Sequence, residues 1–172
     1  MVSKPTHTRA LIEWRPAGLV TWYGSDGCAN AIITAWFALF EGPSPRLRAA
    51  WPVGPGVRRR LWAGADFVLN VPGDKCLMAV RDLVTRGLVS FEVNSELDQE
   101  IICGVRVCAP RLADCILQIE CTNSRLIDSE FDSDIVGDVV LFHHHGVQID
   151  PSANGQVQTQ NLLSRKTFSS FE

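Results

Sequence analysis

The dipeptide Asp26-Gly27 constrains the fold most, because it stands between two apolar runs. Asp-Gly at such a place is typical of a two-residue β-hairpin turn, whose central residues take positive φ. The first run, 19–23, is rich in β-branched and aromatic residues. The second run, 28–40, is long enough for a helix, but the hairpin signal and the sequence Ile32-Ile33-Thr34 favour a strand that is bent or bulged. The sequence therefore predicts antiparallel β structure.

A second β signal lies further along the chain, where apolar and polar residues alternate. Apolar residues Cys115, Leu117, Ile119 and Cys121 alternate with polar residues Gln118, Glu120 and Thr122. This period of two predicts a strand with one buried face. Three more apolar runs bounded by turn residues are predicted as strands, over 47–53, 66–71 and 135–145.

Two or three short helices are expected between these strands. The spacing of apolar residues predicts them over 57–65, 76–88 and 95–102, with Asp74 as the cap of the second. About six strands and these helices predict a mostly β fold, a Greek-key barrel with helices at its mouth. An open α+β sheet fits the same pattern almost as well.

Length and charge limit the class of protein. The chain has 172 residues, 46% of them apolar, which predicts one globular domain over 1–172. The formal net charge of −3 gives no basic field for nucleic acid. No apolar run approaches the roughly 20 residues that span a bilayer, so no membrane association is expected. Residues 1–10 are polar and lack the pattern of a signal peptide, so we expect a cytoplasmic location.

The six cysteines do not form a recognisable motif. They are Cys28, Cys76, Cys103, Cys108, Cys115 and Cys121, and no two have the C-x-x-C spacing of a zinc or thioredoxin site. Because we expect no signal peptide, we expect free, mostly buried thiols rather than disulfides or a metal cluster.

Five arginines fall close together, at Arg46, Arg48, Arg58, Arg59 and Arg60. The last three follow the turn Gly54-Pro55-Gly56, at the start of a predicted helix, where free N–H groups and the helix dipole favour an anion. Arginine adds paired donors suited to phosphate. The residues alone favour a phosphate-monoester site and a solvated basic face equally.

The aromatic residues suggest a site for a flat ring. Trp36 follows Asn30 and Thr34 on the predicted second strand, and an aromatic plane beside amide and hydroxyl groups suits a heterocycle. The run His143–His145 is interpreted as a polar strand end rather than a metal site. We see no nucleophile with a base and no paired acids, so no catalytic residue is predicted and a cofactor is expected to carry any chemistry.

Several segments, in order along the chain, resemble the flavin reductase-like and flavoredoxin family. They are Arg15–Thr21 with Asp26–Asn30, the six-residue step from Asn30 to Trp36, Pro43-Ser44-Pro45, Asp66–Pro72, Ala109–Leu112, Glu120-Cys121 and Gly137-Asp138-Val139. The resemblance covers about residues 14–150. It implies an FMN-binding split β-barrel, a homodimer with one FMN per subunit, and redox chemistry with NAD(P)H or a redox protein as electron donor.

The resemblance also implies site residues. Ring-lining residues would be Asn30, Thr34, Ala35 and Trp36, and phosphate-binding residues would be Gly56, Val57, Arg58, Arg59 and Arg60. The family's usual Arg-x-Thr falls on Pro55-Gly56-Val57 here, so the arginines after it would substitute. The predicted function is an FMN-binding oxidoreductase or electron-transfer flavoprotein. The alternatives are a non-catalytic split-barrel ligand-binding protein and an enzyme like pyridoxamine-phosphate oxidase.

Overall fold

The predicted hairpin is present in the computed structural model, which describes residues 10–14, 18–40, 44–52, 61–128 and 133–151. β2 (Gly18–Tyr23) pairs antiparallel with β3 (Ala29–Thr34), from Gly18 opposite Thr34 to Tyr23 opposite Ala29. Gly27 has a φ of 77°, a conformation that glycine adopts without a steric penalty. The hairpin prediction is confirmed, but its loop has five residues, 24–28, and Asp26 does not take a positive φ.

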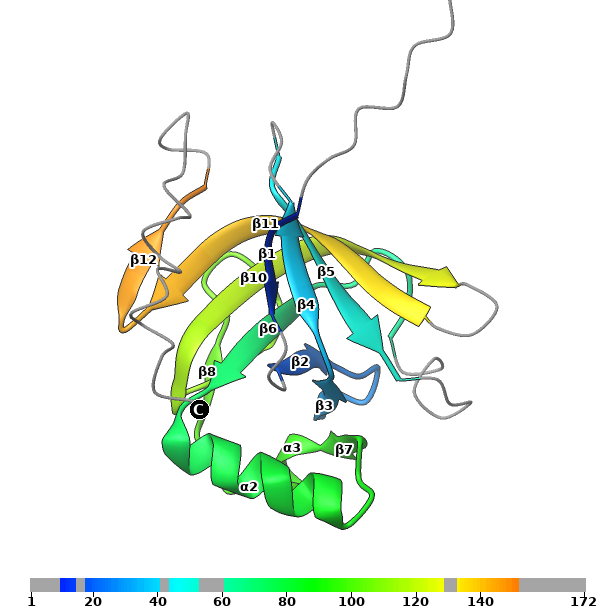
Figure 1. Cartoon of the computed structure of the whole chain (residues 1–172), viewed down its shortest axis with the longest axis vertical. Helices are drawn as coiled ribbons and strands as arrows, with labels where there is room; N and C mark the ends of the chain where they lie inside the picture. Colours follow the sequence, from blue (N-terminus) through cyan, green and yellow to red (C-terminus); the bar gives the residue numbers. More distant parts are fainter. Residues whose placement is uncertain (1–9, 15–17, 41–43, 53–60, 129–132, 152–172) are drawn as a thin grey trace, which may run out of the picture.

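The described residues form one large antiparallel sheet and one small sheet. The remaining strands are β1 (Ala10–Trp14), β4 (Phe37–Phe40), β5 (Arg46–Trp51), β6 (Phe67–Pro72), β7 (Ser90–Glu92), β8 (Ile101–Cys103), β9 (Pro110–Leu112), β10 (Cys115–Asp128), β11 (Ser133–His144) and β12 (Val147–Ile149). The large sheet has the order β1-β4-β5-β11-β10-β6-β2-β3-β7, with β12 paired to β11, and β8 pairs with β9. Figure 1 shows the sheet curling on itself, with β10 and β11 arching over it. The fold is mostly β, as predicted.

The curled sheet encloses the main hydrophobic core. Its largest fully buried side chains include Trp22, Trp51, Phe37, Phe67 and Phe142. The rings of Trp22 and Trp51 pack with centroids 5.5 Å apart. Burying an aromatic side chain of this size contributes on the order of 2–3 kcal/mol. These residues come from β2, β4, β5, β6 and β11, so the core joins strands that are distant in the sequence.

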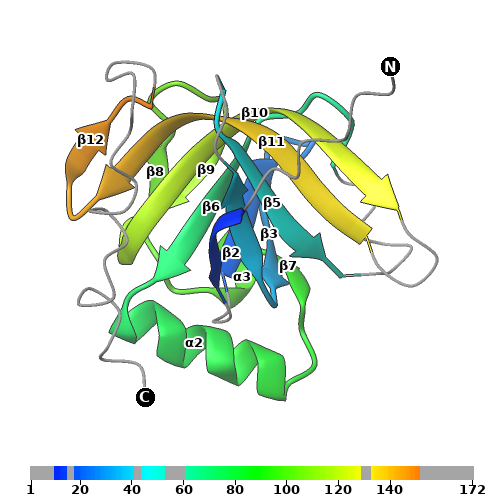
Figure 2. The same cartoon turned by 45° about the horizontal axis from the view of Figure 1, so that its top comes forward.

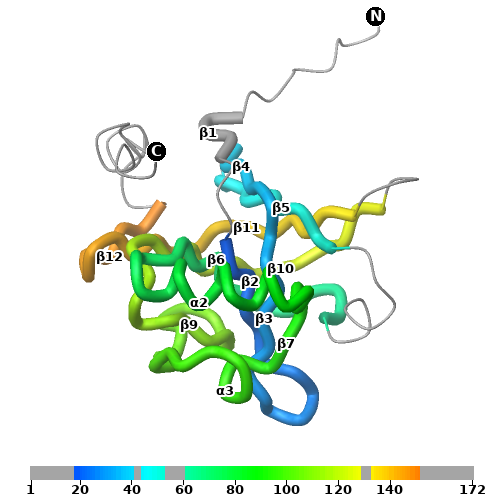
Figure 3. The backbone as a smooth tube through the Cα atoms, turned by 60° about the horizontal axis from the view of Figure 1, so that its bottom comes forward, coloured from blue at the N-terminus to red at the C-terminus, as the bar shows by residue number. Residues whose placement is uncertain are grey.

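A second core lies between the sheet and α2 (Asp74–Thr85). The buried residues of α2 are Cys76, Val80 and Leu83, which share one helical face. They cluster with Ala31 and Ile33 of β3. Figures 2 and 3 show α2 lying across one end of the sheet. Because the second core covers one face of β3 and the main core covers the other, every residue of β3 is buried.

The apolar run 28–40 is two strands rather than one. β3 ends at Thr34, and two residues separate it from the start of β4. The Thr34 hydroxyl donates to the carbonyl of Trp36 at 2.8 Å, and the N–H of Ala50 donates to the same carbonyl at 3.0 Å. These bonds turn the chain away from β2 toward β1 and β5. The single strand expected here is therefore wrong, and the bend is a complete break.

The helix predictions are confirmed in part. α2 is present and Gly87 follows it with a φ of 76°, but its N-cap is Gly73 and Asp74 is its first residue. The helix expected over 95–102 is instead the single turn α3 (Val93–Glu96), with irregular backbone before β8. Burial fixes the position of α3, because Val93 and Leu97 both pack in the second core.

The predicted helix over 57–65 is not helical in its described part. Residues 61–65 form a turn, in which the N–H of Ala65 donates to the carbonyl of Trp62 at 3.1 Å and Gly64 has a φ of 84°. A glycine with positive φ ends a helix rather than continuing it. Residues 57–60 lie outside the described residues.

The predicted positions of the strands are confirmed, but the predicted burial of their faces is not always right. The predictions over 47–53, 66–71 and 135–145 correspond to β5, β6 and β11. β10 is present too, but it is buried on both faces from Leu117 to Cys121. The prediction of one buried face is wrong, because the hairpin of β8 and β9 covers the polar side, leaving Gln118 5% and Glu120 0% exposed.

Candidate functional site

The break between β3 and β4 places an indole ring near the surface. Ala35 is exposed and Trp36 is half-buried. The guanidinium carbon of Arg48, on β5, lies 5.8 Å from the centre of the Trp36 ring. A cation at this distance from an aromatic face is attracted by the ring electrons. Trp36 and Arg48 therefore stabilise one another's positions.

Asp134 of β11 holds Arg48 in this position. Arg48 Nε donates to Asp134 Oδ2 at 2.7 Å, and Arg48 Nη2 contacts the same oxygen. Leu47 and Ala49 face the core, so the alternation along β5 directs Arg48 to the opposite face. The Asp134 side chain is 10% exposed and that of Arg48 is 43% exposed. We call Trp36, Arg48 and Asp134 the Trp36 platform.

The other predicted ring-lining residues lie along β3. Asn30 and Thr34 share one face of the strand with Ile32, which belongs to the main core. Asn30 is buried, and its side-chain amide donates to the carbonyl of Cys28 at 2.9 Å. Asn30 and Thr34 are four positions apart on the strand, which is a distance of about 13 Å. The structure thus brings together Thr34, Ala35 and Trp36 and puts Asn30 at the opposite end of the strand.

The predicted phosphate-binding residues are not placed. All five of them, Gly56, Val57, Arg58, Arg59 and Arg60, lie outside the described residues. Their role stays a prediction, as does the role of the four ring-lining residues.

The sequence interpretation missed two partners of Trp36. Arg48 was identified only as part of the basic cluster, and Asp134 was not singled out. A signal for Asp134 exists, because an acidic residue at the start of an apolar strand needs a partner when it is buried. The pairing with Arg48 depends on β5 and β11 being neighbours, which the local pattern does not reveal.

The Trp36 platform has the chemistry to hold a flat, electron-poor heterocycle such as the ring of a flavin. The indole offers an apolar face, and Arg48 carries five N–H donors, of which two point at Asp134. The exposed backbone at Ala35 lies beside it. These residues fit the ring part of such a cofactor.

A buried carboxylate, Glu120, lies elsewhere in the molecule, under the loop between β8 and β9. Its oxygens accept hydrogen bonds from the backbone N–H of Val105 at 2.8 Å and of Arg106 at 2.7 Å. His143 Nε2 lies 2.6 Å from Glu120 Oε1. Burial raises the pKa of Glu120, but the bonds from His143 and the two backbone groups outweigh it, so the pKa lies below its ordinary value.

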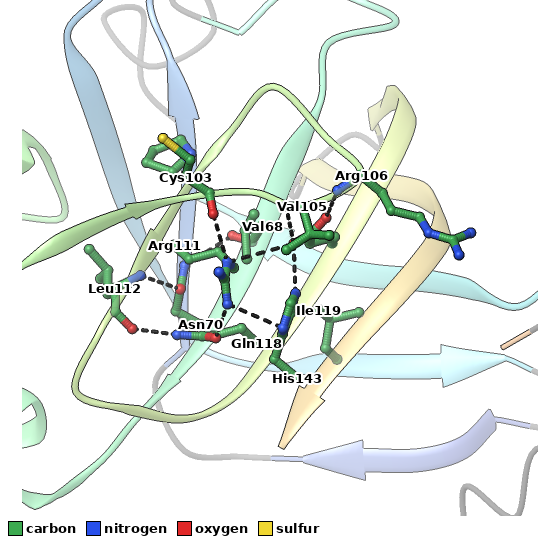
Figure 4. A network of polar contacts seen from close by, with 12 residues as sticks. Val68, Asn70, Cys103, Val105, Arg106, Arg111, Leu112, Gln118, Ile119 and His143 are labelled. Carbon is green, nitrogen blue, oxygen red and sulfur yellow. Dashed lines mark hydrogen bonds and ion pairs between the residues drawn. The ribbon is translucent and has the colours of Figure 1, made fainter. Parts of the chain in front are cut away.

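Arg111 fixes the tautomer of His143. Figure 4 shows its guanidinium between the carbonyl of Cys103, the side chain of Gln118 and Nδ1 of His143, at 3.0, 3.2 and 3.1 Å. Arginine only donates, so Nδ1 accepts and the proton of neutral His143 resides on Nε2, from which it is donated to Glu120.

The amide of Asn70 extends this network toward β2. Its oxygen accepts from the N–H of Leu112 at 3.0 Å, and its nitrogen donates to the hydroxyl of Thr21 at 2.9 Å. Thr21 in turn donates to the carbonyl of Pro110. The network ties the β8–β9 hairpin to the large sheet, which is a structural role.

No metal site is formed in the part of the chain that the structure describes. His143 and His145 do not share a strand face, because β11 ends at His144 and His145 lies in a turn with a φ of 48°. All six cysteines are free thiols. Only Cys76 and Cys121 are buried, so the expectation of mostly buried thiols is wrong for the other four. These four lie at the ends of strands or in the loops between them.

The fold resembles several solved structures. The 2-nitrobenzoate 2-nitroreductase NbaA of Pseudomonas fluorescens matches 76% of this chain with a TM-score of 0.64 and 20% identity, and this chain spans 65% of that protein's length. Flavoredoxin of Desulfovibrio vulgaris (Miyazaki F) matches 84% of this chain and 76% of its own, with a TM-score of 0.58 and 16% identity. A candidate flavin reductase with a split-barrel domain from Shewanella frigidimarina matches 84% and 74%, with a TM-score of 0.65 and 10% identity.

These likenesses define the class of fold. The chain has the split β-barrel fold of the flavin reductase-like and flavoredoxin-like proteins, and the open α+β sheet is excluded. No family model and no curated protein sequence matches the chain. Within the described residues, neither helix is long and apolar enough to cross a membrane.

Proposed function

We propose that this chain is an FMN-binding oxidoreductase or electron-transfer flavoprotein of the flavin reductase and flavoredoxin kind. The observation that carries the proposal is the Trp36 platform at the break between β3 and β4, within a split barrel. A bound flavin would supply the redox chemistry, and the chain would bind, orient and partly desolvate its ring.

The residues have separate roles in this proposal. Trp36 packs against the ring, and Arg48, oriented by Asp134, presents N–H donors to its polar edge. Asn30 and Thr34 shape the strand beside it. The arginines at 58–60 bind the phosphate that distinguishes FMN from riboflavin. The protein works as a cytoplasmic homodimer, with NAD(P)H or a redox protein as electron donor.

Fluorescence titration with FMN tests the role of the platform. We expect the wild-type chain to bind FMN, and Trp36→Ala to weaken binding about two- to thirteenfold, because it removes an aromatic contact worth about 0.5–1.5 kcal/mol. Trp36→Phe keeps an aromatic face and should retain most of the affinity.

Arg48→Ala should also weaken FMN binding, because it removes the N–H donors at the polar edge of the ring. Arg86→Ala is the matched control for this variant. Arg86 is an exposed arginine after α2, paired with Glu96 and Asp82, and its loss should leave FMN affinity unchanged. Failure of the folded wild-type chain to bind FMN at ~100 μM, well above ordinary cofactor affinities, would refute the proposal and favour a non-catalytic binding protein. Tight binding of a pyridoxal phosphate instead would favour the oxidase alternative.

A further inference from the structure

Two cysteines far apart in the sequence meet where α2 begins. Cys76 is the third residue of α2 and is completely buried, and Cys115 is the first residue of β10 and is half-buried. Both belong to the second core. Cys115 lies opposite Pro72 in the β6–β10 register, and the N–H of Gly73 donates to the carbonyl of Asp114 at 3.0 Å. These backbone contacts fix the two cysteines side by side.

The two thiols lie close enough to shift one another's pKa, and the two shifts have opposite signs. The Cys115 thiol donates to the sulfur of Cys76, which holds the pKa of Cys76 below its ordinary value in spite of burial. The same bond, with burial, raises the pKa of Cys115. The first turn of a 12-residue helix also favours a thiolate at Cys76. Cys76 is therefore the better nucleophile of the two thiols, and Cys115 is the better proton donor.

We propose that Cys76 and Cys115 are a redox-active dithiol that a small hydroperoxide converts into a disulfide, which a small thiol reductant reopens. The Cys76 thiolate attacks a peroxide oxygen, the O–O bond breaks, and Cys76 becomes a sulfenic acid as hydroxide leaves and is protonated to water. The Cys115 sulfur then attacks the Cys76 sulfur. The S–S bond forms, the S–O bond breaks, and the hydroxyl leaves with the Cys115 proton as a second water.

The surroundings suit a small oxidant rather than a protein disulfide. Cys76 has no exposed surface, so the only approach to the pair is beside the half-buried Cys115. Hydrogen peroxide is small enough to use it. Cys103 and Cys108 are more exposed, so they serve as the comparison for the Cys76–Cys115 pair.

The disulfide would join the start of α2 to the start of β10. α2 packs on the face of β3 opposite Asn30 and Thr34, so the bond would clamp the helix that supports this strand. It closes a loop of 40 residues, from 76 to 115. Closure of a loop this long should raise the melting temperature by about 4–10 °C.

Peptide mapping of the full-length protein tests this proposal. The reduced chain is treated with a few equivalents of hydrogen peroxide, remaining thiols are alkylated after denaturation, and the digest is analysed by mass spectrometry. We expect a cross-linked Cys76–Cys115 peptide that dithiothreitol abolishes, together with the higher melting temperature. The double variant Cys103→Ser/Cys108→Ser should form the same cross-link, because the exposed thiols take no part.

A trapped intermediate provides the second readout. In Cys115→Ser the second step is blocked, so Cys76 should accumulate as a sulfenic acid that dimedone labels. Recovery of Cys76 and Cys115 as alkylated thiols, while peroxide oxidises Cys103 or Cys108, would overturn the proposal. Oxidation of Cys76 and Cys115 to sulfinic acids without a cross-link would overturn it as well. The wild-type peptide map decides the matter if Cys115→Ser does not fold.

Discussion

The carboxylate of Glu120 shows how a charged side chain can be buried when both of its oxygens accept hydrogen bonds. Two backbone N–H groups and His143 donate to it, and Arg111 Nε lies 3.6 Å from Glu120 Oε1. Removing one partner of such a buried arrangement is expensive, because the remaining groups stay desolvated and unsatisfied. This residue therefore controls the loop between β8 and β9.

Glu120→Gln should reduce the free energy of unfolding by about 2–4 kcal/mol at pH 7. The pKa of Glu120 is lowered by folding, so its contribution is present above the pKa of an unfolded glutamate and is lost as the pH falls through the folded-state pKa. Urea unfolding at pH 7 and near pH 3 should show a smaller difference between variant and wild type at the acidic pH.

Glu100→Gln is the control for this effect. Glu100 is exposed, so its substitution should change stability by no more than about 0.5 kcal/mol. A Glu120→Gln variant as stable as Glu100→Gln at both pH values would contradict the structural role assigned to the network.

At the scale of elements, the break between β3 and β4 positions the Trp36 platform. Thr34→Val removes the hydroxyl that donates to the Trp36 carbonyl but keeps the shape of the side chain. We expect a loss of about 0.5–1.5 kcal/mol of stability and weaker FMN binding, because the turn that carries Trp36 is loosened. Chemical unfolding and FMN titration measure the two effects.

Thr122→Val separates stability from binding. The Thr122 hydroxyl donates to Asp66 at 2.8 Å, away from the platform, so this variant should lose similar stability and keep its FMN affinity. Equal FMN affinities for Thr34→Val and Thr122→Val would show that the turn does not support a flavin site.

Local patterns predicted those elements whose determinants are local. The Asp26-Gly27 turn and the strand after it follow from their own residues. The break at Ala35 does not, because Thr34 and Ala50 create it through the Trp36 carbonyl, and Ala50 belongs to a strand further along the chain. The burial of both faces of β10 could not be predicted for the same reason, because its second face is covered by another segment, the hairpin of β8 and β9.

For the whole molecule, periodicity alone could not separate a barrel from an open sheet. The order of strands places β5 beside β11 and β6 beside β2, and such long-range pairings have no signal in a single run of residues. The family motifs, which occur in the same order along the chain, predicted the split barrel, and the likeness to solved structures confirms this fold. Four of the nine predicted site residues, Asn30, Thr34, Ala35 and Trp36, lie within the described residues. Their partners Arg48 and Asp134 emerge only from the pairing of strands in the sheet.

Assembly is the prediction that belongs to this scale. We expect a homodimer, because the family resemblance implies one with FMN near the dimer interface, and a site of that kind needs a second copy to complete it. Light scattering at micromolar concentration should give twice the chain mass of 19.0 kDa. A monomer under these conditions would contradict a site shared between subunits.

The visible absorbance of the purified protein tests the central claim most directly. The account predicts a yellow protein with flavin absorbance, from which acid releases FMN at about one equivalent per chain, either as isolated or after incubation with FMN and gel filtration. A folded protein that carries no flavin by either route, and takes up none at ~100 μM FMN, would contradict the account.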